Sequence, residues 1–202
     1  MLSFASRVVA ATVAATSFVC SSDAGVVFGS LQDSISIPAT STGLYLNVQT
    51  GQASYNESAV PGWDVNISGA SGLNFISPGG YNFVRLNGAA PTAGPSALPA
   101  GFVVGPQLSN ATWIAGGAAN GFSLLSSNNI VGFRFAGSDG ATRYGWLRIS
   151  LGTSLTGTDR RVVDFAFEST PGASIVAVPA PGALALLAIS GATVLGRRRR
   201  AA

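Results

Sequence analysis

Hydrophobic and polar side chains alternate in several short runs of this chain, and that period of two is typical of a β-strand with one buried face. Leu44, Leu46 and Val48, for example, alternate with Tyr45 and Asn47. The pattern recurs in Trp63, Val65 and Ile67 against Asp64, Asn66 and Ser68, in Leu147, Ile149 and Leu151 against Tyr144, Trp146 and Arg148, and in Val163, Phe165 and Phe167 against Asp164, Ala166 and Glu168. Because the helical period of 3.6 is not sustained between the two ends of the chain, the sequence predicts an all-β fold.

Turn-forming residues separate these runs, as expected for an antiparallel fold. Gly137-Ser138-Asp139-Gly140 lies between the apolar runs 131–136 and 141–151, which predicts a hairpin. Short strands with polar turns favour a single antiparallel β-sandwich or jelly-roll-like domain over residues 25–175. A transmembrane barrel is the structural rival, but the runs are short and uneven. The proline- and glycine-rich stretch 88–108 is interpreted as an extended loop rather than a domain boundary.

The basic charge of the chain is concentrated at its ends. The chain has eleven basic residues, all arginine, against eight acids. Five of these arginines lie in the terminal segments: Arg7, Arg197, Arg198, Arg199 and Arg200. The net charge of the remaining body is therefore close to zero. A nucleic-acid site would need basic residues clustered on the folded domain, so nucleic-acid binding is not expected.

The inventory of reactive side chains argues against catalysis. The chain has no histidine and no lysine, and its one cysteine, Cys20, lies near the N-terminus. Asp164 and Glu168 share a strand face about 13 Å apart, whereas glycosidase carboxylates lie roughly 5–9.5 Å apart. We interpret them as solvated acids beside Arg160 and Arg161. The prediction is a protein that is not an enzyme and has no cofactor.

Metal binding is not expected either. Zinc would lack its nitrogen and sulfur ligands in a mature chain of this composition. Asp139 and Asp159 are single acids in predicted turns, where an aspartate commonly bonds its own backbone. A calcium site assembled from distant loops is the remaining alternative.

The N-terminus has the pattern of a secretory signal peptide. Arg7 precedes the apolar run Val8–Val19, which is too short to span a membrane, and small residues follow it. We expect signal peptidase to cleave after Ala24, so that residues 1–24 are removed. A retained N-terminal anchor and lipid attachment at Cys20 are the alternatives.

The C-terminus has the pattern of a short membrane anchor. Gly182 to Gly196 is fifteen residues without a charge, followed by the four arginines Arg197, Arg198, Arg199 and Arg200. As a helix this segment would reach roughly 22 Å, somewhat less than a hydrocarbon core of about 30 Å. Arginines next to a span keep that end on the cytoplasmic side. We therefore predict a short transmembrane helix within a tail of residues 176–202, with these arginines as the membrane stop and the domain outside.

The same tail resembles a known family of exported bacterial proteins. Val178-Pro179-Ala180-Pro181-Gly182, the apolar helix and the four arginines are similar to a PEP-CTERM sorting signal, with Ala180 where the name-giving motif has glutamate. Three further motifs resemble strands that precede the tail in such proteins: Gly132-Phe133-Arg134-Phe135, Tyr144-Gly145-Trp146 and Asp164-Phe165-Ala166-Phe167-Glu168. The resemblance implies processing by an exosortase-like membrane enzyme, brief anchoring in the inner membrane, and delivery to the surface of a biofilm-forming bacterium that secretes exopolysaccharide.

Two functions are compatible with these observations. The first is a non-enzymatic structural protein of the cell surface or extracellular matrix. The second is a carbohydrate-binding module, in which Tyr144 and Trp146, on one strand face, and Trp113 stack on sugars. Their alternative role is packing in the core. Burial of that strand face would favour the structural protein.

Overall fold

The computed structural model describes residues 25–79 and 82–178, and in that part of the chain the regular structure is almost entirely β. One 3-10 helix, η1 (Glu57–Ala59), is the exception among those residues. The strands are β1 (Val26–Ser36), β2 (Leu44–Leu46), β3 (Ala53–Ser54), β4 (Val65–Ser68), β5 (Asn74–Ile76), β6 (Phe83–Leu86), β7 (Val103–Val104), β8 (Ala111–Ile114), β9 (Gly116–Ala118), β10 (Ser126–Ala136), β11 (Thr142–Leu151), β12 (Arg160–Glu168) and β13 (Ile175–Val176). The all-β prediction is confirmed; the predicted signal peptide and transmembrane helix lie outside the described residues.

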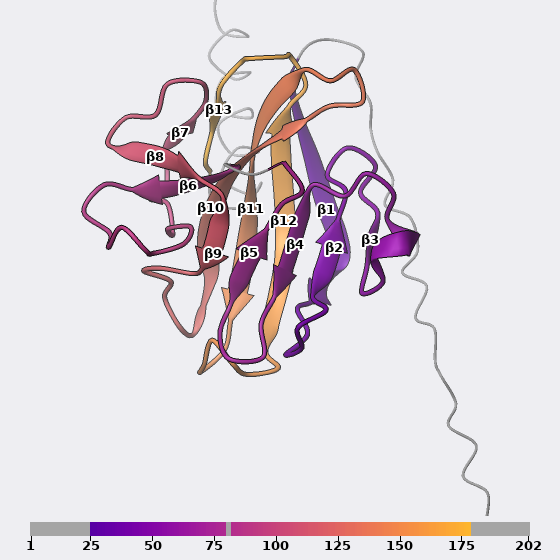
Figure 1. The fold of residues 1–202 in the computed structure, drawn as a ribbon, viewed down its shortest axis with the longest axis vertical. Coiled ribbons are helices and arrows are strands. Elements are labelled where there is room, and N and C mark those ends of the chain that lie inside the picture. Colours follow the sequence, from indigo (N-terminus) through magenta and orange to yellow (C-terminus); the bar gives the residue numbers. More distant parts are fainter. Residues whose placement is uncertain (1–24, 80–81, 179–202) are drawn as a thin grey trace, which may run out of the picture.

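The strands form two sheets and a short ribbon, and their pairings are antiparallel. We call β1-β12-β11-β10-β6-β8 the large sheet, β3-β2-β4-β5-β9 the small sheet, and the pair β13-β7 the ribbon. Figure 1 shows the small sheet as a separate layer in front of β10, β11 and β12. Apolar side chains of both sheets meet between these layers and form one cluster, the central core.

The central core contains most of the side chains that the alternation assigned to a buried face. Leu44, Leu46 and Val48 are buried there from the small sheet, and Leu147 and Ile149 from the large sheet. The predicted hairpin is also confirmed, because β10 and β11 pair on either side of the turn at 137–140. In these segments the period of two indicated correctly which face is buried.

The prediction was wrong at the start of β12. Arg148 pairs with Asp164, but the next residue, Ile149, pairs with Val162, so β12 has one extra residue there. Val162 therefore enters the central core and is fully buried, while Val163 is only half-buried. Such a bulge places two residues opposite one, so a strict alternation cannot continue through it.

The opposite face of the large sheet is covered as well. Chain segments distant in sequence lie over it: the loop region that contains Leu98, and the ribbon, which contributes Val104 and Ile175. With Trp146 and Tyr144 of the sheet, these residues belong to a second apolar cluster, which we call the outer core. The stretch 88–108 is thus mostly loop, as predicted, but it includes β7 and closes one face of the sheet.

Candidate functional site

The predicted sugar-binding rings lie in or against the outer core. Trp146 is 1% exposed and Tyr144 is 5% exposed, so neither ring is open to a ligand. Trp113 is half-buried, with its ring centroid 5.8 Å from that of Tyr144, and the Arg134 guanidinium lies 4.8 Å from the Trp113 centroid. These rings pack against one another. Their burial favours the structural interpretation of this strand face.

Two acids of β12, Asp164 and Glu168, have hydrogen-bond donors within the fold. The Arg148 guanidinium binds the Asp164 carboxylate through two contacts, one of them Nε to Oδ1 at 2.8 Å. Glu168 accepts a hydrogen bond from the backbone N–H of Thr170 at 2.9 Å. The interpretation of Asp164 and Glu168 as solvated acids was wrong, because both are buried. Arg148 of the neighbouring strand β11 pairs with Asp164, and spacing along one strand does not reveal such a cross-strand contact.

Arg160 is fully buried at the start of β12. Its guanidinium donates to the carbonyl oxygens of Gly72 and Leu155 at 2.7 Å each, of Pro38 at 2.6 Å and of Gly69 at 3.1 Å. Burial lowers the pKa of this group. Because arginine starts above 12, it remains a cation stabilised by carbonyl dipoles. Arg160 therefore connects the large sheet to the loops around the small sheet, and its role is structural.

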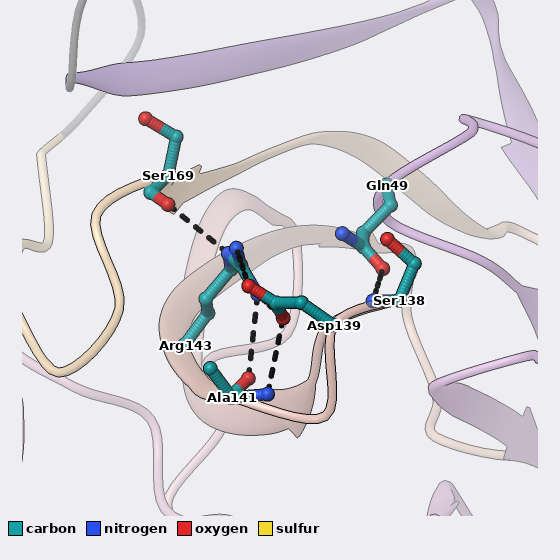
Figure 2. Close-up of polar contacts among 6 residues, drawn as sticks. All are labelled: Gln49, Ser138, Asp139, Ala141, Arg143 and Ser169. Carbon is teal, nitrogen blue, oxygen red and sulfur yellow. Dashed lines mark hydrogen bonds and ion pairs between the residues drawn. The ribbon is translucent and has the colours of Figure 1, made fainter.

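The tip of the β10–β11 hairpin carries an ion pair, shown in Figure 2. Arg143 lies between the Asp139 carboxylate, with Nη1 to Oδ1 at 2.6 Å, and the Ser169 carbonyl, which accepts from Nε at 3.0 Å. Asp139 also accepts from the backbone N–H of Ala141, as expected for an aspartate in a turn. The Arg143 guanidinium holds the pKa of the Asp139 carboxyl well below its usual range. Within residues 25–79 and 82–178, no three acid, histidine or cysteine side chains are grouped as metal ligands.

A second group of aromatic residues lies near the β3 edge of the small sheet and is partly open to solvent. We call Tyr45, Glu57 and Trp63 the aromatic corner; they come from β2, η1 and the segment before β4. Figure 1 shows η1 beside β3 at the outer edge of this sheet. The rings of Tyr45 and Trp63 pack edge to face, with their centroids 5.2 Å apart. Trp63 Nε1 donates to Glu57 Oε1 at 3.0 Å.

Asn47 fixes the loop that carries the aromatic corner. Its side-chain NH2 donates to the carbonyls of Pro61 at 3.1 Å and Gly62 at 2.9 Å, and its oxygen accepts from the N–H groups of Gln49 and Thr50. The amide thus uses both of its donors and both acceptor positions. The loop is tied to the end of β2 just before Trp63.

Asp64 and Val60 also fix the loop that precedes β4, Asp64 through a hydrogen bond and Val60 through its burial. Asp64 Oδ2 accepts from the backbone N–H of Val48 at 2.9 Å. Burial raises the pKa of Asp64 to about 6, and the Val48 hydrogen bond acts in the opposite direction. Val60 is fully buried beneath the loop. The loop is therefore a packed element of the fold with defined side-chain positions.

The alternation placed Trp63 on the inner face with Val65 and Ile67, and this was wrong. β4 begins at Val65, and Gly62, with φ +66°, turns the chain just before Trp63. The ring is half-buried against Tyr45 instead of entering the central core. Pro61-Gly62 is a turn signal that could have indicated where the strand period starts.

The predicted tail is described only at residues 176–178: Val176 lies in β13, and Val178, the first residue of the sorting motif, packs against the outer core. The other residues predicted for export lie outside the described residues, so their roles stay predictions: the cleavage site Ala24, the motif residues Pro179, Ala180, Pro181 and Gly182, and the membrane stop Arg197, Arg198, Arg199 and Arg200. Across the described ranges, no helix has the length and apolar character needed to cross a membrane.

Comparisons with known proteins add no relative to this description. No protein-family model, curated protein sequence or solved structure matches the chain.

Proposed function

We propose that this chain is an exported, non-enzymatic structural protein of the bacterial cell surface or extracellular matrix. In this proposal, residues 25–175 form one jelly-roll-like sandwich that a signal peptide and a sorting tail deliver to the envelope. An exosortase-like membrane enzyme processes the tail, and the domain is then displayed or released.

The observation that carries the proposal is the use of potential site residues within the fold. Trp146 and Tyr144 are buried in the outer core, Asp164 is paired with Arg148, and Arg160 is bound by backbone carbonyls. Side chains that hold a fold together in this way are not free to bind or transform a ligand. This arrangement supports a domain whose main property is a stable, compact shape.

The two ends of the described domain support processing close to its boundaries. The backbone N–H of Gly25 donates to Ser169 Oγ at 2.9 Å, and the Gly25 carbonyl accepts from the Ser169 hydroxyl at 2.8 Å. At the other end Ala177 is fully buried and Val178 contacts the outer core. Cleavage after Ala24 and removal of the tail beyond Val178 would leave these contacts intact.

Intact-mass analysis of secreted and membrane fractions tests the proposal. The expected mature chain begins at Gly25, and the processed form lacks the four arginines of the membrane stop. Replacing all four by serine (Arg197→Ser, Arg198→Ser, Arg199→Ser and Arg200→Ser) should abolish retention in the membrane fraction, while Arg161→Ser serves as a control within the folded domain. Full-length protein confined to the cytosol would refute the proposal.

A further inference from the structure

We propose that the aromatic corner is a carbohydrate-binding site, and that it takes a neutral or amino-substituted oligosaccharide stacked on Trp63. The residues predicted from the sequence for this role, Tyr144 and Trp146, are on the other sheet and are buried. The inference goes beyond the proposed function and does not depend on export. Binding and delivery are measured by separate experiments, so either can fail alone.

Part of the aromatic surface of the corner is accessible to solvent. The side chains of Trp63 and Tyr45 are only half-buried, and Glu57 beside them is exposed. The C–H groups on one face of a pyranose carry partial positive charge because they adjoin oxygen-bearing carbons. Aromatic ring faces are electron-rich, and the two surfaces therefore attract each other in stacked contact.

Trp63 is held in a fixed position. Its edge-to-face contact with Tyr45 and its hydrogen bond to Glu57 hold the indole from two sides. The loop beneath it is tied by Asn47 and by buried Val60. A ring that is already oriented loses little conformational entropy when a ligand binds, and this favours affinity.

A polar side chain lies next to the Trp63 ring. Glu57 is exposed at the mouth of the corner and uses Oε1 to accept from Trp63. An ionised carboxylate has about four acceptor positions, so it retains capacity for sugar hydroxyl or ammonium donors.

Charge sets the class of sugar. Glu57 is the charged member of the corner, so it repels uronic acids and other anionic sugars. An amino sugar brings an ammonium that pairs with the carboxylate and is also attracted to an indole face. We therefore expect the order of affinity to be amino sugar, then neutral sugar, then uronic acid.

The test uses the full chain purified in a detergent without a sugar headgroup, since a maltoside would compete for the site. Glucosamine, cello- and alginate oligosaccharides, each about six residues long, serve as amino, neutral and anionic probes in calorimetric titrations. Trp63→Ala should weaken binding of the amino and neutral probes at least tenfold, and Trp63→Phe should restore part of it. Glu57→Gln should abolish the preference for the amino probe while keeping neutral binding.

Two controls separate binding from folding. Phe28→Ala removes an exposed ring from the large sheet, 43% exposed, and should leave all three titrations unchanged. The far-ultraviolet circular dichroism and the cooperative urea transition of each variant must show a folded domain before its titration is compared. The proposal is overturned if none of the probes binds at millimolar concentration, or if folded Trp63→Ala binds as the parent does. In either case Tyr45 and Trp63 serve only to pack the loop.

Discussion

The two aromatic groups of this protein differ in what lies over them. In the outer core, Trp146 of the large sheet is closed in by the ribbon and by the loop region 88–108, which are distant in sequence. At the aromatic corner, Trp63 is held by a local loop and faces solvent on part of its surface. Tryptophan is thus buried in packing on the large sheet and partly exposed to solvent beside the small sheet.

The difference shows that coverage by remote chain segments, and not residue type, decides the fate of these rings. The two buried carboxylates on these sheets differ in their partners. Asp164 is buried with a cation, Arg148, whereas Asp64, at the base of the aromatic corner, has the Val48 N–H as its hydrogen-bond donor. Asp164 is neutralised by its ion pair with Arg148, whereas Asp64 has a raised pKa because burial disfavours its charged form.

The largest expected effect comes from truncating the ring on the closed side. Trp146→Ala should lower the free energy of unfolding by about 3–5 kcal/mol, because it leaves a cavity in the outer core. Trp63→Ala should cost about 1 kcal/mol, since its ring is already partly hydrated. Urea denaturation of the full chain, followed by circular dichroism, measures both. Equal losses for the two variants would mean that the corner is as closed as the outer core.

Arg160 tests whether the closed side also depends on its buried polar contacts. Arg160→Met keeps much of the side-chain volume but leaves four backbone carbonyls without their donor, so we expect a loss on the order of 3 kcal/mol. Arg160→Lys should fall between the parent and the methionine variant, because an ammonium has fewer donors and a shorter reach. Arg161→Met is the matched control, since Arg161 is exposed beside it. If Arg160→Met and Arg161→Met unfold at the same urea concentration, the carbonyl contacts contribute nothing to stability.

Local pattern predicted the strands well where the backbone period was unbroken. The core faces around Leu44 and Leu147 follow from alternation alone, and the β10–β11 hairpin follows from its turn residues. The period failed at Val163, where a bulge inserts a residue, and at Trp63, which precedes its strand. Both are local departures that a fixed period of two cannot represent.

The two aromatic groups could not be predicted because each depends on contacts that a period along one strand does not describe. The burial of Tyr144 and Trp146 is decided by the ribbon, whose two strands, β7 and β13, are themselves far apart in the sequence. The aromatic corner needs Asn47 to reach the carbonyls of Pro61 and Gly62. Local propensity in a single sequence does not indicate which residues make such contacts.

The smallest of the three effects depends on pH and compares the two buried carboxylates. The folded-state pKa of Asp64, about 6, lies above its ordinary value of 3.8. The folded protein therefore binds a proton that the unfolded chain has released between about pH 4 and pH 6, and stability falls as the pH rises through that window. Asp64→Asn keeps an oxygen acceptor for Val48 without a charge, so it should raise stability by roughly 2 kcal/mol at pH 8 and have little effect at pH 4.

Asp164→Asn is the matched variant on the closed side. It removes the charge that compensates Arg148 and should therefore lower stability at pH 8, the opposite sign to Asp64→Asn. Urea midpoints of the parent and both variants at pH 4, 6 and 8 distinguish the two cases. If Asp64→Asn destabilises the protein at pH 8 as Asp164→Asn does, Asp64 has a compensating partner in solution and the two sides of the molecule do not differ in this respect. A gain confined to pH values above 6 would instead show that the open corner retains its charge at a cost to the stability of the fold.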